Sequence, residues 1–146
     1  MGTEMSRFPR CFPFDFAEKI LPQGLPPLKL DAFRVCINGT INKDSFLSTF
    51  EMVLSGAKPE PWNWEEQRKE PGAYSVSCNE TLGGAQKPLT CLVKHHPAAF
   101  LIHGTASSEL GPMQRSKDRD PQYPSPDHID WWLYADSDPS ASFSPV

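Results

Sequence analysis

Polar side chains that could do chemistry recur on two segments with the alternating pattern of a β-strand. Arg34 lies in one of these segments, and Ser75 and Ser77 occupy alternate positions of the other. Because alternate residues of a strand share a face, the two serines are expected to point the same way. The acidic side chains that could act with them are Glu51, on a segment with helical spacing, and Glu109. These five residues form the candidate catalytic set.

Two short motifs resemble those of a known enzyme fold. Arg34 followed by Ser75-Val76-Ser77 resembles the arginine and serine-x-serine elements of the ADP-ribosyltransferase fold. His103-Gly104-Thr105 is similar to the histidine-glycine-serine/threonine opening of the poly-ADP-ribosyltransferase branch. The resemblance implies a nicotinamide-nucleotide pocket supported by the arginine and serine, and a later glutamate that acts on the ribose. The glutamates after the serine pair, Glu80 and Glu109, do not form the Glu-x-Glu pair of that pattern. NAD or another nucleotide is therefore expected only under this alternative, and otherwise we expect no cofactor.

Histidines and cysteines do not show the spacing of a metal site. The four cysteines are widely separated, and no Cys or His pair has the close spacing of a structural zinc site. His103 and His128 could meet at Asp130 if their strands are neighbours. No GxSxG element is present to expose a nucleophilic serine. We expect no metal and no serine nucleophile of this type.

Aromatic side chains favour a different function, the binding of a protein partner. The candidate binding residues are Trp62, Trp64, Trp131, Trp132 and His128. Tryptophan is enriched among the residues that dominate protein–protein affinity. Consecutive residues of a strand face opposite sides, so one ring of the Trp131–Trp132 pair should enter the core. The other should face outward or lie under the N-terminal segment.

The elements that must position these residues alternate between strand and helix. Residues 30–38 predict a strand with Phe33, Val35 and Ile37 on its inner face. Residues 43–55 predict one helix, capped by Asn42 and ended by Gly56. Residues 73–78 predict a second strand, and the apolar run 98–104 predicts a central strand buried on both faces.

The remaining segments are less sharply defined by their patterns. Residues 85–95 fit helical spacing, but a strand fits nearly as well, so this choice stays open. Residues 105–127 read as a long polar loop. The aromatic run 128–134 predicts the last strand, which closes the sheet over an inner layer that includes Phe33, Val35, Val76 and Phe100.

The N-terminal part of the chain has a proline and phenylalanine pattern that opposes a long helix. We expect residues 1–29 to form an extended arm packed on the domain, because four exposed phenylalanines would promote association. Residues 30–146 should form a single domain. Residues 1–6 fit a loose myristoylation pattern, and a cloning scar before a native start at Met5 explains them equally well.

Length, charge and hydropathy limit the classes of function. A chain of 146 residues predicts one domain, and a net charge of -4 argues against nucleic acid as the default partner. The sequence shows neither a signal segment nor an apolar run of about 20 residues, so we expect a cytoplasmic protein with reduced cysteines and no membrane span.

These patterns together predict an α+β fold, a small mixed or antiparallel sheet with one or two helices packed on one face. The function they favour is protein–protein binding, in the manner of an inhibitor or accessory factor of bacterial, phage or mobile-element origin. The alternative is an NAD- or nucleotide-handling enzyme with an ADP-ribosyltransferase-like site.

Overall fold

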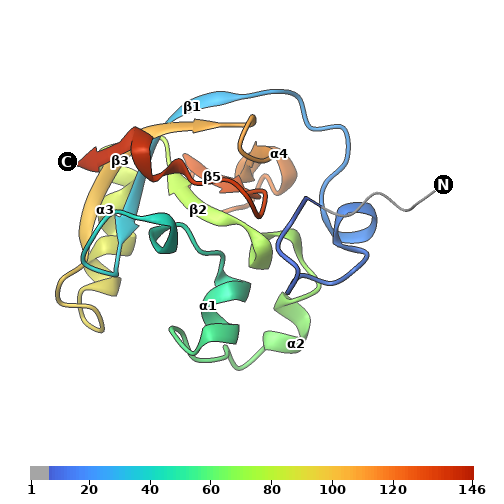
Figure 1. Cartoon of the computed structure of the whole chain (residues 1–146), viewed down its shortest axis with the longest axis horizontal. Coiled ribbons are helices and arrows are strands. Elements are labelled where there is room, and N and C mark those ends of the chain that lie inside the picture. Colours follow the sequence, from blue (N-terminus) through green and yellow to red (C-terminus); the bar gives the residue numbers. More distant parts are fainter. Residues whose placement is uncertain (1–6) are drawn as a thin grey trace.

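The computed structural model of the chain describes residues 7–146, so the myristoylation pattern and the start at Met5 lie outside the described residues. Within that range the strands form one antiparallel sheet in the order β4-β5-β2-β1-β3-β6 (Figure 1). The expected α+β fold with a small antiparallel sheet is confirmed. The strands are β1 (Lys29–Cys36), β2 (Val76–Asn79), β3 (Phe100–Ser107), β4 (Met113–Arg115), β5 (His128–Trp131) and β6 (Phe143–Pro145).

One helix, α3, connects two strands that flank β1. It runs from Leu82 to Leu92 and settles the open choice for residues 85–95 in favour of helix, even though Pro88 lies inside it. The other α-helices are α1 (Thr49–Ser55), α2 (Trp64–Gln67) and α4 (Ser116–Arg119). Single turns of 3-10 or π-helix occur at Phe16–Ile20, Lys43–Ser45, Pro71–Tyr74 and Pro139–Ser142.

The predicted single helix over residues 43–55 is wrong in its middle. Asn42 does cap a helical turn, but that turn ends at Ser45. A new helix starts after Ser48, whose hydroxyl accepts from the Glu51 amide at 3.1 Å, while the Glu51 carboxylate accepts from the Ser48 amide. This reciprocal capping competes with continuation of the first turn. Gly56 ends α1 at a φ of 82°, as expected for a glycine at that position.

The core face of the sheet is covered by the segment that follows β1 and by the C-terminal segment. Phe46 and Phe143 reach this face and contact each other, with ring centroids 4.9 Å apart. Small residues of β1 leave room for these rings. The buried strand residues of the core face are Ala32, Cys36, Val76, Cys78, Ile102, Ala106, Met113, Ile129 and Trp131, together with Phe143 of β6.

The opposite face, called the α3 face below, is more polar. Residues paired across neighbouring strands share a face, which places Phe33, Asn79, His103, His128 and Asp130 together here. The expected inner layer is therefore wrong for Phe33 and Val35, which lie on the face opposite Val76. Phe33 instead stacks on His103 at a centroid distance of 4.3 Å. Alternation along β1 was read correctly, but the wrong side of it was assigned to the core.

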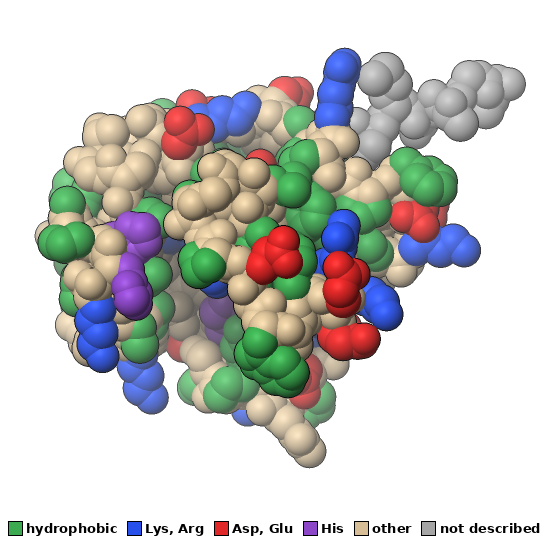
Figure 2. Space-filling view, turned by 90° about the horizontal axis from the view of Figure 1, so that it is seen from below, with side chains coloured by type: hydrophobic (Ala, Val, Ile, Leu, Met, Phe, Trp, Pro, Cys, Tyr) green, Lys and Arg blue, Asp and Glu red, His purple; other side chains and the backbone are tan. Residues whose placement is uncertain are grey.

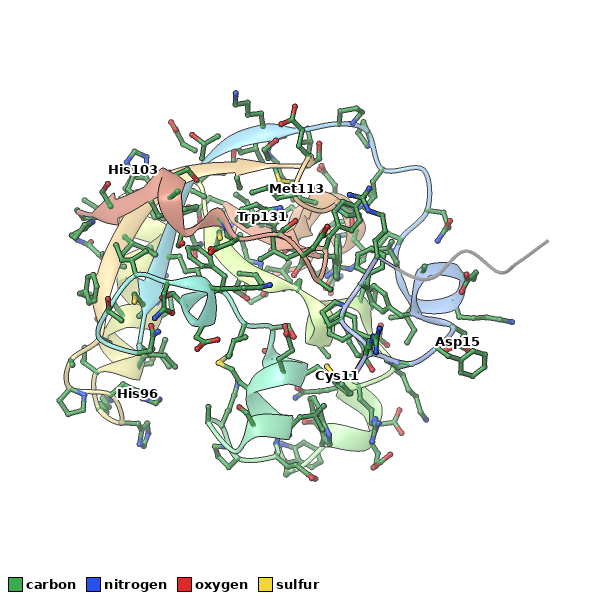
Figure 3. All side chains as sticks on the ribbon, viewed as in Figure 1. Cys11, Asp15, His96, His103, Met113 and Trp131 are labelled. Carbon is green, nitrogen blue, oxygen red and sulfur yellow. The ribbon has the colours of Figure 1, made fainter. Side chains whose placement is uncertain are left out.

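Trp131 and Trp132 are both fully buried, in two different clusters. Trp131 lies in the core-face cluster, near Met113 in Figure 3, and its indole N–H donates to the Ser107 carbonyl at 3.2 Å. Trp132 points the other way, and its indole N–H donates to the Pro71 carbonyl at 2.9 Å. The expected division of the pair holds, with Trp132 packed against side chains of the N-terminal segment.

The cluster around Trp132, called the aromatic cluster below, also anchors the N-terminal segment. Phe14 does not take part, because its ring is 96% exposed, so the expectation that all four phenylalanines pack is wrong for this one. The extended arm is not confirmed as such, and the division into residues 1–29 and 30–146 stays a prediction. The cluster comprises Phe8, Phe12, Phe16, Phe50, Trp64, Ala73, Tyr74 and Trp132.

Three expectations about the sheet need correction. β3 is not central, since it lies between β1 and β6 and carries an exposed His103. The tryptophan strand is not the last, because Phe143–Pro145 adds β6 after it. The polar stretch 105–127 contains the end of β3, together with β4 and α4, and is not one loop.

β1 and β2 pair at a single position, Phe33 with Asn79, so the sheet divides into two halves of three strands.

Candidate functional site

A buried carboxylate on β5 gathers polar side chains from three parts of the chain. The side chain of Asp130 is 3% exposed. One of its oxygens accepts from the Ser75 hydroxyl at 2.6 Å. The other accepts from the Ser116 hydroxyl at 2.8 Å and from Arg119 Nη2 at 2.7 Å. The buried negative charge is thus paired and hydrogen-bonded, as burial requires. We call Ser75, Ser116, Arg119, His128 and Asp130 the Asp130 network.

The order of groups in this network differs from that of a nucleophilic triad. Ser116 Oγ lies 2.6 Å from His128 Nδ1 and donates its proton to Asp130. Because a serine hydroxyl has one hydrogen, it then accepts the hydrogen on His128 Nδ1. A nucleophilic serine needs the reverse arrangement, in which it gives its proton to the imidazole. Ser116 is also fully buried, so no acyl group could reach it in this structure.

A second carboxylate lies next to the network, at the start of α3. Asp127 accepts from the amide and hydroxyl of Thr81 at 2.9 and 2.6 Å, and from Asn79 Nδ2 at 3.1 Å. Burial would raise the pKa of Asp127, but hydrogen bonds from Thr81, Asn79 and Ser125 outweigh it and hold the pKa below its ordinary value. A Cβ at Gly84 would lie 2.2 Å from this carboxylate, so the space beside Gly84 is occupied by Asp127.

Burial also shifts the pKa of two groups that could take part in proton transfer. Burial lowers the pKa of His128, against the opposing charge of Asp130. The imidazole of His128 is therefore protonated more readily in the unfolded chain than in the folded one. The stability that neutral His128 provides is lost as the pH falls below about 6.5. Burial raises the pKa of the Cys78 thiol to about 11, which keeps it protonated and unreactive at neutral pH.

Arg34 does not join the serines of the candidate catalytic set. Its guanidinium points to the core face and donates to three carbonyls, of Ser45 at 2.8 Å, Ser77 at 2.6 Å and Leu47 at 3.2 Å. Burial lowers its pKa. Ser75 points to Asp130 on the opposite side of the sheet. The side chains of the arginine and the serines therefore do not converge in one cleft.

The two glutamates of the candidate set also lie elsewhere. Glu51 caps α1, and Glu109 is exposed in the turn after β3. The acid that meets Ser75 is Asp130, which the sequence suggested only as a metal ligand. Alternation along His128-Ile129-Asp130 was the available signal for a shared polar face, whereas Ser116 and Arg119 lay in a stretch read as a solvated loop.

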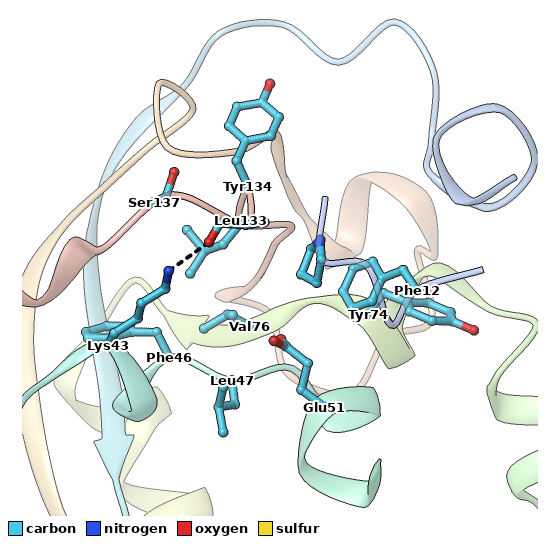
Figure 4. Close-up of a pocket in the computed structure, with 12 residues that line it drawn as sticks. Phe12, Lys43, Phe46, Leu47, Glu51, Tyr74, Val76, Leu133, Tyr134 and Ser137 are labelled. Atoms are coloured by element: carbon cyan, nitrogen blue, oxygen red, sulfur yellow. Dashed lines mark hydrogen bonds between the residues drawn. The ribbon is translucent and has the colours of Figure 1, made fainter. Parts of the chain in front are cut away.

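Two cavities of the described residues lie away from the Asp130 network, and no residue of that network lines either of them. One cavity of about 40 Å³, drawn in Figure 4, lies between the N-terminal segment, α1 and residues 133–137. It holds a few water molecules at most. Lys43 Nζ crosses its edge to donate to the Ala135 carbonyl at 2.7 Å. A second, open groove of about 330 Å³ follows Leu21–Pro27 beside Tyr134.

Metal ligands do not gather in the part of the chain that the structure describes: residues 7–146 contain no group of three His, Cys, Asp or Glu side chains placed to hold an ion. His103 and His128 lie on β3 and β5, which β1 and β2 separate. They therefore cannot share Asp130. His103 lies 3.7 Å from Asp31 instead.

Comparison with known proteins gives a short result. No family model matches this chain. No curated protein and no solved structure matches it either. Within residues 7–146, every helix is too short or too polar to cross a membrane.

The four tryptophans differ sharply in exposure. Trp64, Trp131 and Trp132 are buried, so these rings offer no area to a partner in this structure. Trp62 is 96% exposed, on the loop between α1 and α2. That loop lies at the lower edge of Figure 1, and the view from below in Figure 2 shows hydrophobic side chains among interspersed charges. His128 is half-buried, under Tyr123, whose ring centroid lies 4.8 Å away.

Proposed function

We propose that this protein acts by binding another protein, and that Trp62 is its main contact. The observation that carries the proposal is a nearly fully exposed indole two residues from a buried one. Trp64 is buried in the aromatic cluster, and this packing explains why a tryptophan occupies its position. Within residues 7–146 the Trp62 ring is 96% exposed, so packing does not explain a large apolar ring at this place, and such rings dominate binding energy when a partner buries them.

The backbone around Trp62 is held in place before any partner arrives. The Trp64 amide donates to the Pro61 carbonyl at 3.0 Å, which closes a turn with Trp62 at its tip. Gln67 Nε2 donates to Asn63 Oδ1 at 2.6 Å, and the Trp64 ring stacks near Phe50. A fixed loop loses little conformational entropy on association, which favours affinity. An inhibitor or accessory role fits this mode of action.

The test uses a second exposed aromatic ring as its control. Phe14 is exposed to the same fraction as Trp62 but lies on the N-terminal segment. The tagged full chain is used to capture proteins from extracts of its source cells, and the captured protein is purified and titrated by calorimetry. We expect Trp62→Ala to weaken the Kd by about 30-fold, a hot-spot effect. Phe14→Ala should leave the Kd unchanged. Failure to capture any protein, or equal binding by wild type and Trp62→Ala, would contradict the proposal.

A second candidate is the nucleotide-handling enzyme, favoured by one observation. The resemblance to ADP-ribosyltransferases implies that the arginine and serine support the nicotinamide-nucleotide pocket and that a later glutamate acts on the ribose. Ser75 does contact an acidic side chain from a later strand, at 2.6 Å, although that residue is Asp130 and not a glutamate. Ser77 pairs with Asp130 across the strands and is itself exposed on the same face. NAD is the nucleotide that this alternative would use.

This candidate is tested by NAD binding and by release of nicotinamide, measured by calorimetry and chromatography. If it is right, the wild type binds NAD, and Ser77→Ala and Asp130→Asn reduce nicotinamide release by about 100-fold. Glu18→Gln serves as the control, since Glu18 is an exposed acid on the N-terminal segment and outside the candidate catalytic set, and should change nothing. Absence of NAD binding by the folded wild type would exclude this function.

A further inference from the structure

The segment between β4 and β5 covers Asp130 and His128 from the α3 face. It comprises residues 116–127, namely α4 followed by a stretch without regular structure that contains Pro121, Pro124 and Pro126. Ser116 and Arg119 supply two of the three side chains that bind Asp130. Further along, the Tyr123 ring lies over His128 with an interplanar angle of 28°.

Apart from the Tyr123 ring on His128 and the Arg119 guanidinium 5.8 Å from the centroid of the Trp132 ring, the attachments of this segment are polar and lie mainly at its two ends. No residue of 116–127 belongs to the core-face cluster or to the aromatic cluster. At one end, Ser116 and Arg119 contact Asp130. At the other end, the Asp127 carboxylate contacts Thr81 at the start of α3, and the Glu80 amide donates to the Asp127 carbonyl at 3.0 Å. Segments with few apolar contacts open at lower free energy than the core.

We propose that residues 116–127 form a lid, latched by Asp127, that opens while the sheet stays folded and exposes Asp130 and His128. The latch has a matching recess, because α3 has no side chain at Gly84, where the carboxylate lies. This inference is independent of partner binding through Trp62, which lies on the loop between α1 and α2 and not on the lid.

Hydrogen exchange of the full chain at neutral pH, followed by mass spectrometry, tests the lid. We expect Asp127→Ala to raise exchange in peptides from 116–127 by about tenfold, through loss of several hydrogen bonds to a carboxylate. Exchange in β1 and β3 should not change. Asp118→Ala is the matched control, because Asp118 is an exposed aspartate of the same segment.

A second variant approaches the latch from the other side. Gly84→Ala places a methyl group against the Asp127 carboxylate and should raise exchange in the same peptides as Asp127→Ala. If both variants raise exchange equally in the lid and throughout the sheet, Asp127 stabilises the whole domain and the lid is ruled out. Equal exchange in Asp127→Ala and Asp118→Ala would also overturn it.

Discussion

Replacing Asp130 with alanine should lower the free energy of unfolding by about 3–5 kcal/mol, since it removes one partner of a buried ion pair. Arg119 would keep its charge, with its side chain 24% exposed and without a carboxylate to pair with. Ser116 would lose its carboxylate acceptor, and Ser75 would keep only the longer bond to the Gly72 carbonyl at 3.2 Å, in a site that water does not reach. Denaturation in urea, followed by circular dichroism, measures the change.

The control for this variant is an acid without such partners. Glu109→Ala changes an exposed side chain and should shift the free energy of unfolding by less than about 0.5 kcal/mol. If Asp130→Ala changed the free energy of unfolding by less than about 0.5 kcal/mol as well, the Asp130 network would contribute little to stability. Its serines and arginine would then have to find other partners in the folded state.

Truncation of Trp132 to alanine should cost about 3–5 kcal/mol, the range found for large aromatic side chains in protein cores. The ring is fully buried in the aromatic cluster, and its indole N–H is bonded to the Pro71 carbonyl. Its loss would leave a cavity under the N-terminal segment and an unpaired carbonyl. Calorimetric melting and urea denaturation both report the change.

Trp62→Ala is the matched substitution of the same residue type at an exposed position. It should change stability by less than about 0.5 kcal/mol, because the Trp62 ring is 96% exposed. The pair of variants therefore separates the two roles of tryptophan in this chain. Equal losses in both would mean that Trp62 also supports the fold, and its proposed binding role would need another explanation.

Local signals identified most elements, but not how they join. Alternation located β1, and Gly56 marked the end of α1 as predicted. The helix over 43–55 failed because Ser48 and Glu51 form a capping box that the apolar spacing concealed. The core face of β1 was misassigned because Phe33, Val35 and Ile37 form the apolar side of the alternation, whereas the true core side carries Arg34, whose charge is accommodated by three carbonyl acceptors. Phe46 and Phe143, distant in sequence, fill that face instead.

The candidate site was harder to predict, because its parts come from different segments. Ser75 was identified from its motif, but its partner Asp130 depends on which strands are neighbours, and β5 pairs with β2 only in the folded chain. Ser116 and Arg119 lie in a stretch whose mixed charges indicate exposure. Packing of α4 on β5 places both near a buried acid, which composition alone does not indicate.

The single pairing between β1 and β2 has a mechanical consequence. Where a continuous ladder would resist sliding of one half-sheet past the other, this junction has one paired position and the guanidinium of Arg34, which reaches the Ser77 carbonyl from β1. The same guanidinium holds the Ser45 and Leu47 carbonyls. A side chain thus fastens the two halves to each other and to the segment that covers the core face, and relative rotation of the halves would require Arg34 to release the Ser77 carbonyl.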